Sequence, residues 1–123
     1  MTDVGQEEAA RMYAAALSGT LTIDPQVARQ CATHCEELAQ TFRSQIDAVE
    51  DAVRQTGFGG FVSARELQTG FAAKSGEARD VLSAYREAAL KFQAAFLAAG
   101  QLFAEADVAN KAALNAIRPG EAR

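Results

Sequence analysis

The sequence predicts an all-α protein, an antiparallel hairpin of two long helices preceded by a short one. Apolar side chains recur with four-then-three spacing from Phe71 to Ile117, which places them along one side of a helix. Alanine, the strongest helix former, is abundant, whereas valine and isoleucine are few and never alternate over the length of a strand. The chain has 123 residues and only two prolines, and neither interrupts the apolar repeat. These observations predict helices and no sheet.

The first predicted helix is short and runs from Gln6 to Leu17. Glu7 and Glu8 lie in its first turn, where the helix dipole favours negative charge. The segment Ser18-Gly19-Thr20 ends it, and we expect residues 21–23 to be extended.

The first long helix opens at Asp24-Pro25, because aspartate is a good N-cap and proline suits the first helical position. We expect it to end near Thr56-Gly57. Its apolar side consists of Val27, Cys31, Cys35, Leu38, Phe42, Ile46, Val49 and Val53. The glycine-rich stretch over residues 57–61 then predicts a sharp reversal of the chain.

The second long helix is predicted to start at Ala64, because Ser63 and Glu66 have the spacing of a capping box. We expect it to run unbroken to Pro119-Gly120. Its seam consists of Phe71, Ser75, Ala78, Leu82, Tyr85, Ala89, Phe92, Phe96, Ala99, Phe103, Ala106, Asn110, Ala113 and Ile117. A strand, or a break near the middle of residues 75–115, would contradict this fold and the export interpretation that follows from it.

The short turn between the long helices predicts antiparallel neighbours. A lone hairpin with two apolar sides leaves part of each exposed, so we expect pairing with a second hairpin into a four-helix bundle, as a homodimer or a heterodimer. The predicted pairing seam is Phe42, Ile46, Val49, Leu82, Tyr85, Phe92 and Phe96. The predicted organisation is a helix and linker over 1–20, a hairpin domain over 21–118 and a disordered tail over 119–123.

Charge and hydropathy exclude several function classes. The formal net charge is −4 and the basic residues are scattered, so the basic patch of a nucleic-acid-binding protein is absent. No apolar stretch approaches the roughly 20 residues that cross a bilayer. Residues 1–10 carry three acidic side chains and no basic one, unlike the start of a secretory signal peptide. If the protein leaves the cell, we therefore expect export without a cleavable signal.

Side chains capable of catalysis or metal binding are scarce. Cys31, His34 and Cys35 share one side of the first long helix, but a tetrahedral zinc site usually takes four ligands from two elements. We favour the interpretation that both cysteines are small apolar packing residues; a metal site and an intermolecular disulfide are the alternatives. The single histidine excludes most catalytic triads. We therefore expect no enzyme activity and no cofactor.

Phe103 and Asp107 are four residues apart, so an aromatic ring and a carboxylate share one side of a helix. Phe103 also belongs to the seam, so packing in the core and recognition by a partner are both open interpretations.

Three short motifs resemble those of the ESX (type VII) secretion-associated proteins of actinobacteria, within the WXG-type superfamily of helical hairpins. Leu21-Thr22-Ile23-Asp24-Pro25 is similar to the opening element of that family. The pair Phe103 and Asp107 resembles its Tyr-x-x-x-Asp/Glu export signal, with phenylalanine in place of tyrosine. Phe58 and Gly60 stand where the superfamily has Trp-x-Gly, with phenylalanine in place of tryptophan.

The resemblance implies a non-enzymatic substrate or accessory protein of type VII secretion that acts through helix–helix contacts. It implies a protein that is cytoplasmic before export and then secreted or held at the cell surface, with the secretion machinery and a second hairpin as partners. The alternative is a cytoplasmic helical adaptor or chaperone that binds a partner helix.

Overall fold

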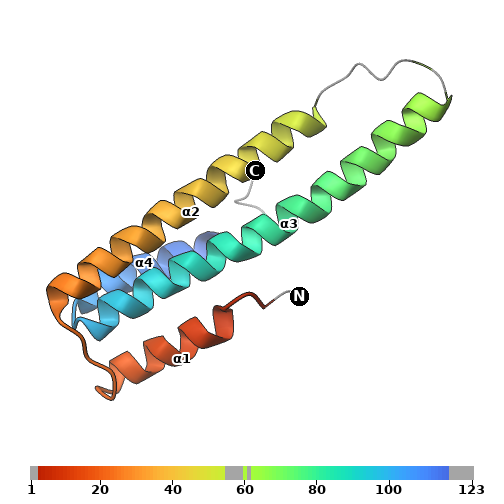
Figure 1. Ribbon diagram of the computed structural model, residues 1–123. Helices are drawn as coiled ribbons and strands as arrows, with labels where there is room; N and C mark the ends of the chain where they lie inside the picture. The colour runs from red at the N-terminus through yellow and green to blue at the C-terminus, as the bar shows by residue number, and fades with distance from the viewer. Residues whose placement is uncertain (1–2, 55–59, 61, 117–123) are drawn as a thin grey trace.

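A computed structural model describes residues 3–54, 60 and 62–116 of the chain. It is built from helices, and the described residues include no strand, which confirms the predicted all-α class. The helices are α1 (Gln6–Leu17), α2 (Pro25–Val53), α3 (Val62–Ala99) and α4 (Phe103–Ala116) (Figure 1).

The first two helices begin where their local signals predict. Both ends of α1, Gln6 and Leu17, match the prediction, and Ser18 forms its C-cap. At the start of α2, the Asp24 carboxylate accepts hydrogen bonds from the backbone N–H groups of Gln26, at 2.8 Å, and Val27, at 3.3 Å. These bonds satisfy donors that have no partner inside the helix, and Pro25 occupies a position where no donor is needed. The helix ends at Val53 with Arg54 as its C-cap, slightly before the predicted end.

The next helix, α3, starts at Val62, two residues before the predicted position, so Ser63 lies within the helix. Most of the predicted glycine-rich turn falls outside the described residues, Phe58 included, as does the predicted tail over 119–123. Gly60 is described and exposed.

The prediction of one unbroken helix from Ala64 to Pro119 is wrong, because the chain turns after Ala99 and α4 folds back along α3 (Figure 1). Gln101 adopts a positive φ of 63°. The N–H of Leu102 donates to the Leu97 carbonyl at 2.9 Å, and the N–H of Gln101 donates to the Ala98 carbonyl at 2.9 Å. This pattern is a Schellman motif, which ends a helix by satisfying its last carbonyl groups.

The turn between α3 and α4 lies against the segment that leads into α2. The N–H of Ile23 donates to the Ala99 carbonyl at 2.8 Å. A Cβ added to Gly100 would overlap the Cβ of Ala28 and would lie 3.3 Å from the Cα of Pro25. Only glycine therefore allows this approach of the two backbones.

The inner half of α3 is the centre of the molecule, since α3 packs against each of the other three helices (Figure 1). Most of its buried side chains there are alanines, and they point to nearly every side of the helix. The buried residues of this half are Ala88, Ala89, Leu90, Ala94, Ala95, Leu97, Ala98 and Ala99. A core of alanines lets the surrounding helices approach closely, and most of the large apolar side chains are left nearer to the surface.

The outer halves of α2 and α3 extend beyond α1 and α4 as a two-helix arm, which we define as residues 42–53 and 62–85 (Figure 1). Ile46 is the only buried residue in this arm, all of whose residues are described. The arm therefore lacks the third and fourth helices that enclose the rest of the hydrophobic core. None of the helices in the described ranges is long and apolar enough to cross a membrane.

Candidate functional site

The outward side of α4 carries the predicted recognition pair. Phe103 is the first residue of α4 and is 47% exposed, and Asp107 lies one turn further on the same side. Leu114, 49% exposed, continues that side two turns later. We call Phe103, Asp107 and Leu114 the α4 face. The Asp107 carboxylate forms an ion pair with the Lys111 ammonium at 3.1 Å, on the surface.

Alanines make the contact between α4 and the body of the protein. Ala106, Ala109 and Ala113 are buried and lie on one side of the helix, whereas the larger Phe103 and Leu114 are turned toward solvent. Because Phe103 is 47% exposed, its ring does not pack in the core, which was one of its two open interpretations. The α4 face is therefore an ordered, solvent-accessible surface on a helix that is anchored from behind.

The predicted pairing seam is only partly buried. Ile46 is buried; Phe42, Val49, Leu82, Phe92 and Phe96 are half-buried, and Tyr85 is exposed. The rings of Phe42 and Tyr85 stack across α2 and α3, with centroids 5.5 Å apart and an interplanar angle of 19°. This stack closes the base of the arm, and it leaves one side of Tyr85 in contact with solvent.

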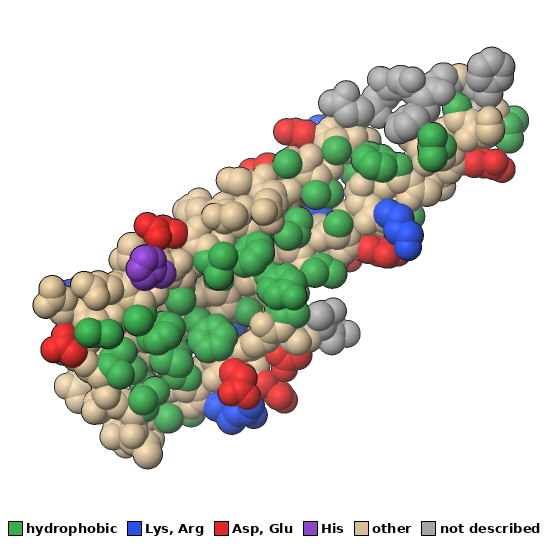
Figure 2. Space-filling model, in the orientation of Figure 1, with side chains coloured by type: hydrophobic (Ala, Val, Ile, Leu, Met, Phe, Trp, Pro, Cys, Tyr) green, Lys and Arg blue, Asp and Glu red, His purple; other side chains and the backbone are tan. Residues whose placement is uncertain are grey.

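Hydrophobic side chains gather on one side of the molecule, over α1, α2 and α3, and continue in a band toward the arm (Figure 2). Leu17, Val27, Leu38, Val81 and Tyr85 are exposed members of the apolar sides of these helices. The buried residues of α2, such as Ala28, lie about 100° around the helix from Val27, since each residue turns the helix by that angle. The apolar side of α2 is therefore wider than the surface that α3 covers.

Cys31, His34 and Cys35, the group of the alternative metal-site interpretation, are not placed together as ligands. Both thiols are free and half-buried, whereas the His34 ring is exposed and its Nδ1 lies 3.4 Å from Glu37. Within the described part of the chain, no three His, Cys, Asp or Glu side chains are placed to hold an ion. Burial, followed by the neighbouring Cys31, raises the pKa of the Cys35 thiol. A raised pKa favours the neutral thiol and lowers its reactivity.

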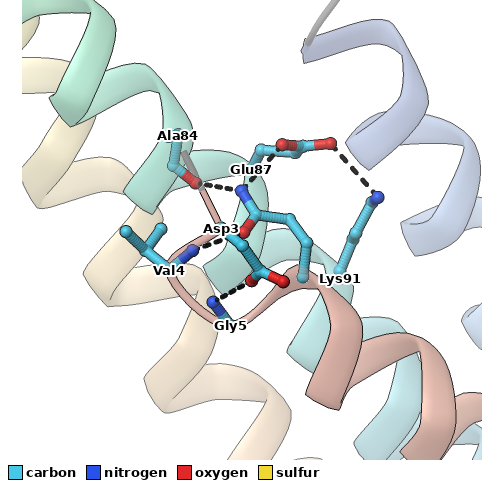
Figure 3. A network of polar contacts seen from close by, with 7 residues as sticks. Asp3, Val4, Gly5, Ala84, Glu87 and Lys91 are labelled. Atoms are coloured by element: carbon cyan, nitrogen blue, oxygen red, sulfur yellow. Dashed lines mark hydrogen bonds and ion pairs between the residues drawn. The ribbon is translucent and has the colours of Figure 1, made fainter. Parts of the chain in front are cut away.

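The sequence analysis did not anticipate how α1 attaches to α3 (Figure 3). The Gln6 amide donates to the Ala84 carbonyl and to the Glu87 carboxylate, each at 2.9 Å. Glu87 in turn forms an ion pair with Lys91 at 3.2 Å. The two hydrogen bonds of Gln6 join residues about 80 positions apart, so no local pattern in the sequence could indicate them.

The segment before α1 is held by short-range hydrogen bonds. The Asp3 carboxylate accepts from the Gly5 N–H at 2.9 Å, and this bond lowers the pKa of Asp3. Gly5 has a φ of 131°, and an added Cβ there would lie 3.1 Å from the Phe92 ring. Glycine at this position therefore lets the start of α1 lie directly on α3.

No protein-family model, curated protein or solved structure matches this chain. The resemblance to ESX-associated hairpins therefore rests on the motifs alone. Of these, the pair Phe103 and Asp107 is placed together on the α4 face, and Leu21–Pro25 forms the junction with the end of α3.

The arrangement provides helix surfaces suited to contact with other proteins. Every buried side-chain polar atom among the described residues has a hydrogen-bond partner. Exposed apolar and aromatic groups lie on the α4 face, on the arm and on the side shown in Figure 2, and Val108 is exposed on another side of α4. Such groups are typical of surfaces that bind another helix.

Proposed function

We propose that this protein is a non-enzymatic, secretion-associated helical protein that leaves the cell through a type VII pathway. The observation that carries this proposal is the exposure of Phe103 and Asp107 on one side of α4. An export receptor must reach its signal in the folded protein, and an aromatic ring with a carboxylate one turn away offers an apolar and a charged contact together.

The packing of α4 supports the proposal, because alanines hold the helix to α3 and Phe103 is left half-exposed. The break at Gly100–Leu102 lies within residues 75–115, so it meets the condition given above against the unbroken helix and the export interpretation drawn from it. The long second helix is therefore no longer an argument for export. The proposal therefore depends on the α4 face and on the Leu21–Pro25 element, and it no longer depends on the length of the second predicted helix.

Partner binding by the arm is the second part of the proposal. Residues 42–53 and 62–85 form two helices with one buried side chain between them, Ile46. A second hairpin, of this chain or of a related one, would complete a four-helix bundle there. Such pairing would bury the exposed Leu67 and Val81 and would stabilise the arm.

Export from an actinobacterial host with and without a functional type VII system tests the proposal. The protein is expected in the culture filtrate of the first host only, and equal amounts from both hosts would refute it. Phe103→Ala and Asp107→Ala are each expected to reduce export while the helical circular dichroism signal stays unchanged. Asn115→Ala, at an exposed position on a different side of the same helix, is the matched control and should be exported normally.

The exposed apolar residues of the arm also favour the second candidate, a cytoplasmic adaptor that binds a partner helix. This candidate predicts that the protein stays in the cell, whether or not Phe103 and Asp107 are replaced. The two candidates therefore give opposite results in the same export experiment.

A further inference from the structure

A groove of about 540 Å³ runs between α2 and α4, over the inner half of α3. Leu90 and Leu97 of α3 form its floor, Ala39 lies on the α2 side, and Ala104 and Val108 lie on the α4 side. Val108 is 69% exposed although it is apolar. The groove lies on a different side of α4 from the α4 face, because Val108 is about 100° around the helix from Asp107.

The charges along this groove are unevenly distributed. Glu105 lines it near the start of α4 and is paired with Arg29 of α2 at 2.7 Å. Arg86 lines it toward the arm and has no ion pair or hydrogen bond with any described residue. Burial, followed by the charge of Arg43, lowers the pKa of Arg86. Arg43 itself forms an ion pair with Asp47 at 3.6 Å.

The remaining charge, Glu36, lies further along the groove, between Arg86 and the end that Leu97 and Glu105 line. Ala39 and Leu90 belong to one buried cluster, and α2 and α3 run in opposite directions (Figure 1). Glu36 precedes Ala39 by about one turn and Arg86 precedes Leu90 by about one turn, so the two charges are separated by about 10 Å along the groove. Among the charged residues that line the groove, Arg86 is therefore the one nearest the arm, and Glu36 and Glu105 lie further from that end.

We propose that this groove binds an amphipathic helix of a partner protein, with an acidic side chain of that helix against Arg86 and apolar side chains on Leu90, Leu97 and Val108. The groove lies between two helices and above a third, which is the position of a further helix in a bundle. Alanines along its walls let a helix backbone approach closely. A carboxylate forms two parallel hydrogen bonds with a guanidinium, and arginine is enriched among the residues that dominate binding energy at interfaces.

Two synthetic peptides test this assignment. Each is an amphipathic helix of about 18 residues, long enough to be helical, with leucines along one side. One carries two glutamates in its last turn, and the other carries lysines at the same two positions. Fluorescence anisotropy measures their affinities, and the alanine methyl signals of the labelled protein show where they bind.

The glutamate peptide is expected to bind the wild-type protein about tenfold more tightly than the lysine peptide. Its binding should shift the methyl signals of Ala39, Ala104 and Ala112. Arg86→Glu should reverse the preference between the two peptides, whereas Arg65→Glu, on the arm, should leave it unchanged. Val108→Lys should weaken binding of the glutamate peptide about tenfold. Val62→Lys, at a position that is 71% exposed and outside the groove, should have no effect.

Three results would overturn the assignment. The first is unshifted groove methyl signals when the glutamate peptide is added. The second is a preference between the peptides that Arg86→Glu does not change. The third is a concentration-dependent shift of the same methyl signals without peptide, together with a dimer by light scattering, which would show that a second copy of this chain fills the groove. None of these results depends on export, so the test is independent of the proposed function.

Discussion

Gly100 occupies the closest approach between α2 and the end of α3. Two atoms limit the space there, the Cβ of Ala28 and the Cα of Pro25. Both belong to the first turn of α2, which Asp24 fixes through its cap, so neither can move aside independently. The glycine thus has a packing role in addition to its place at the end of a helix.

We expect Gly100→Ala to destabilise the protein by about 1–3 kcal/mol, the usual cost of overpacking. Urea unfolding followed by circular dichroism measures this change. Gly76→Ala is the matched control, because its added methyl group meets no atom within 4 Å and Gly76 lies inside α3. That control should stabilise by about 0.5–1 kcal/mol, since alanine replaces glycine in a helix. Equal effects of the two substitutions would show that helix propensity alone governs Gly100.

Cys35 is a thiol that the folded protein holds in its neutral form to higher pH than the unfolded chain does. The cause is mainly burial, so the effect should persist in Cys31→Ser, which leaves a single cysteine. In that variant we expect the alkylation rate of native protein to reach half its maximum at a higher pH than in urea. Because the folded-state pKa is raised, stability should fall as pH rises from the unfolded pKa through the folded one. Coincident profiles would contradict the burial of this thiol.

At the scale of elements, α1 lies on α3 through its buried Ala9 and Ala16 and through two hydrogen bonds from Gln6, its first residue. Gln6→Glu removes both donors that reach Ala84 and Glu87, and it places a second carboxylate beside Glu87. Glutamate in the first turn would otherwise favour the helix, so the substitution separates helix propensity from attachment.

We expect Gln6→Glu to loosen α1 and to increase tryptic cleavage at Arg11 several-fold, because each lost hydrogen bond is worth about 0.5–1.5 kcal/mol. Time-resolved proteolysis with mass spectrometry measures the rate. Gln30→Glu, at an exposed position of α2, is the control and should leave cleavage at Arg11 unchanged. An unaltered rate in Gln6→Glu would show that apolar packing alone holds α1.

Local signals were sufficient to predict where α1 and α2 begin. Gln6–Leu17 is bounded by acidic residues and by Ser18-Gly19, and Asp24-Pro25 marks the start of α2. The break after Ala99 could not be predicted from periodicity, because the four-then-three spacing continues in phase through it. Gly100 was the available signal, but a single glycine costs a helix only about 1 kcal/mol and does not by itself end one. The helix ends after Ala99 because α4 packs back onto α3, which is a tertiary contact.

At the scale of the whole molecule, part of the candidate site could be predicted from the sequence. The spacing of Phe103 and Asp107 placed them on one side of a helix, but their exposure follows from the break and from the packing of α4. The groove could not be anticipated, because it combines α2, α3 and α4 around Arg86. Its assembly depends on tertiary contacts that no window of the sequence contains.

The two halves of the molecule should differ in local stability. Ile46 is the only buried residue of the arm, whereas the inner half of α3 is enclosed by three helices. We expect backbone amides at residues 64–80 to exchange with deuterium at least about tenfold faster than those at residues 90–99, since sparse burial lowers the free energy of local opening. Mass spectrometry of peptic fragments measures this. Uniform protection at a concentration where the chain is dimeric would place the dimer interface on the arm.

The start of α1 and the end of α4 lie at the same level of the molecule. Gln6 lies beside Ala84, and Ala113, near the end of α4, packs in the cluster that contains Ala89. A fluorescent protein or affinity handle joined before Gln6 or after Ala116 would therefore attach near the middle of the molecule's long axis. The outer parts of the arm helices and the opposite end, where α1 leads into α2, would stay unobstructed for imaging or for capture on a surface.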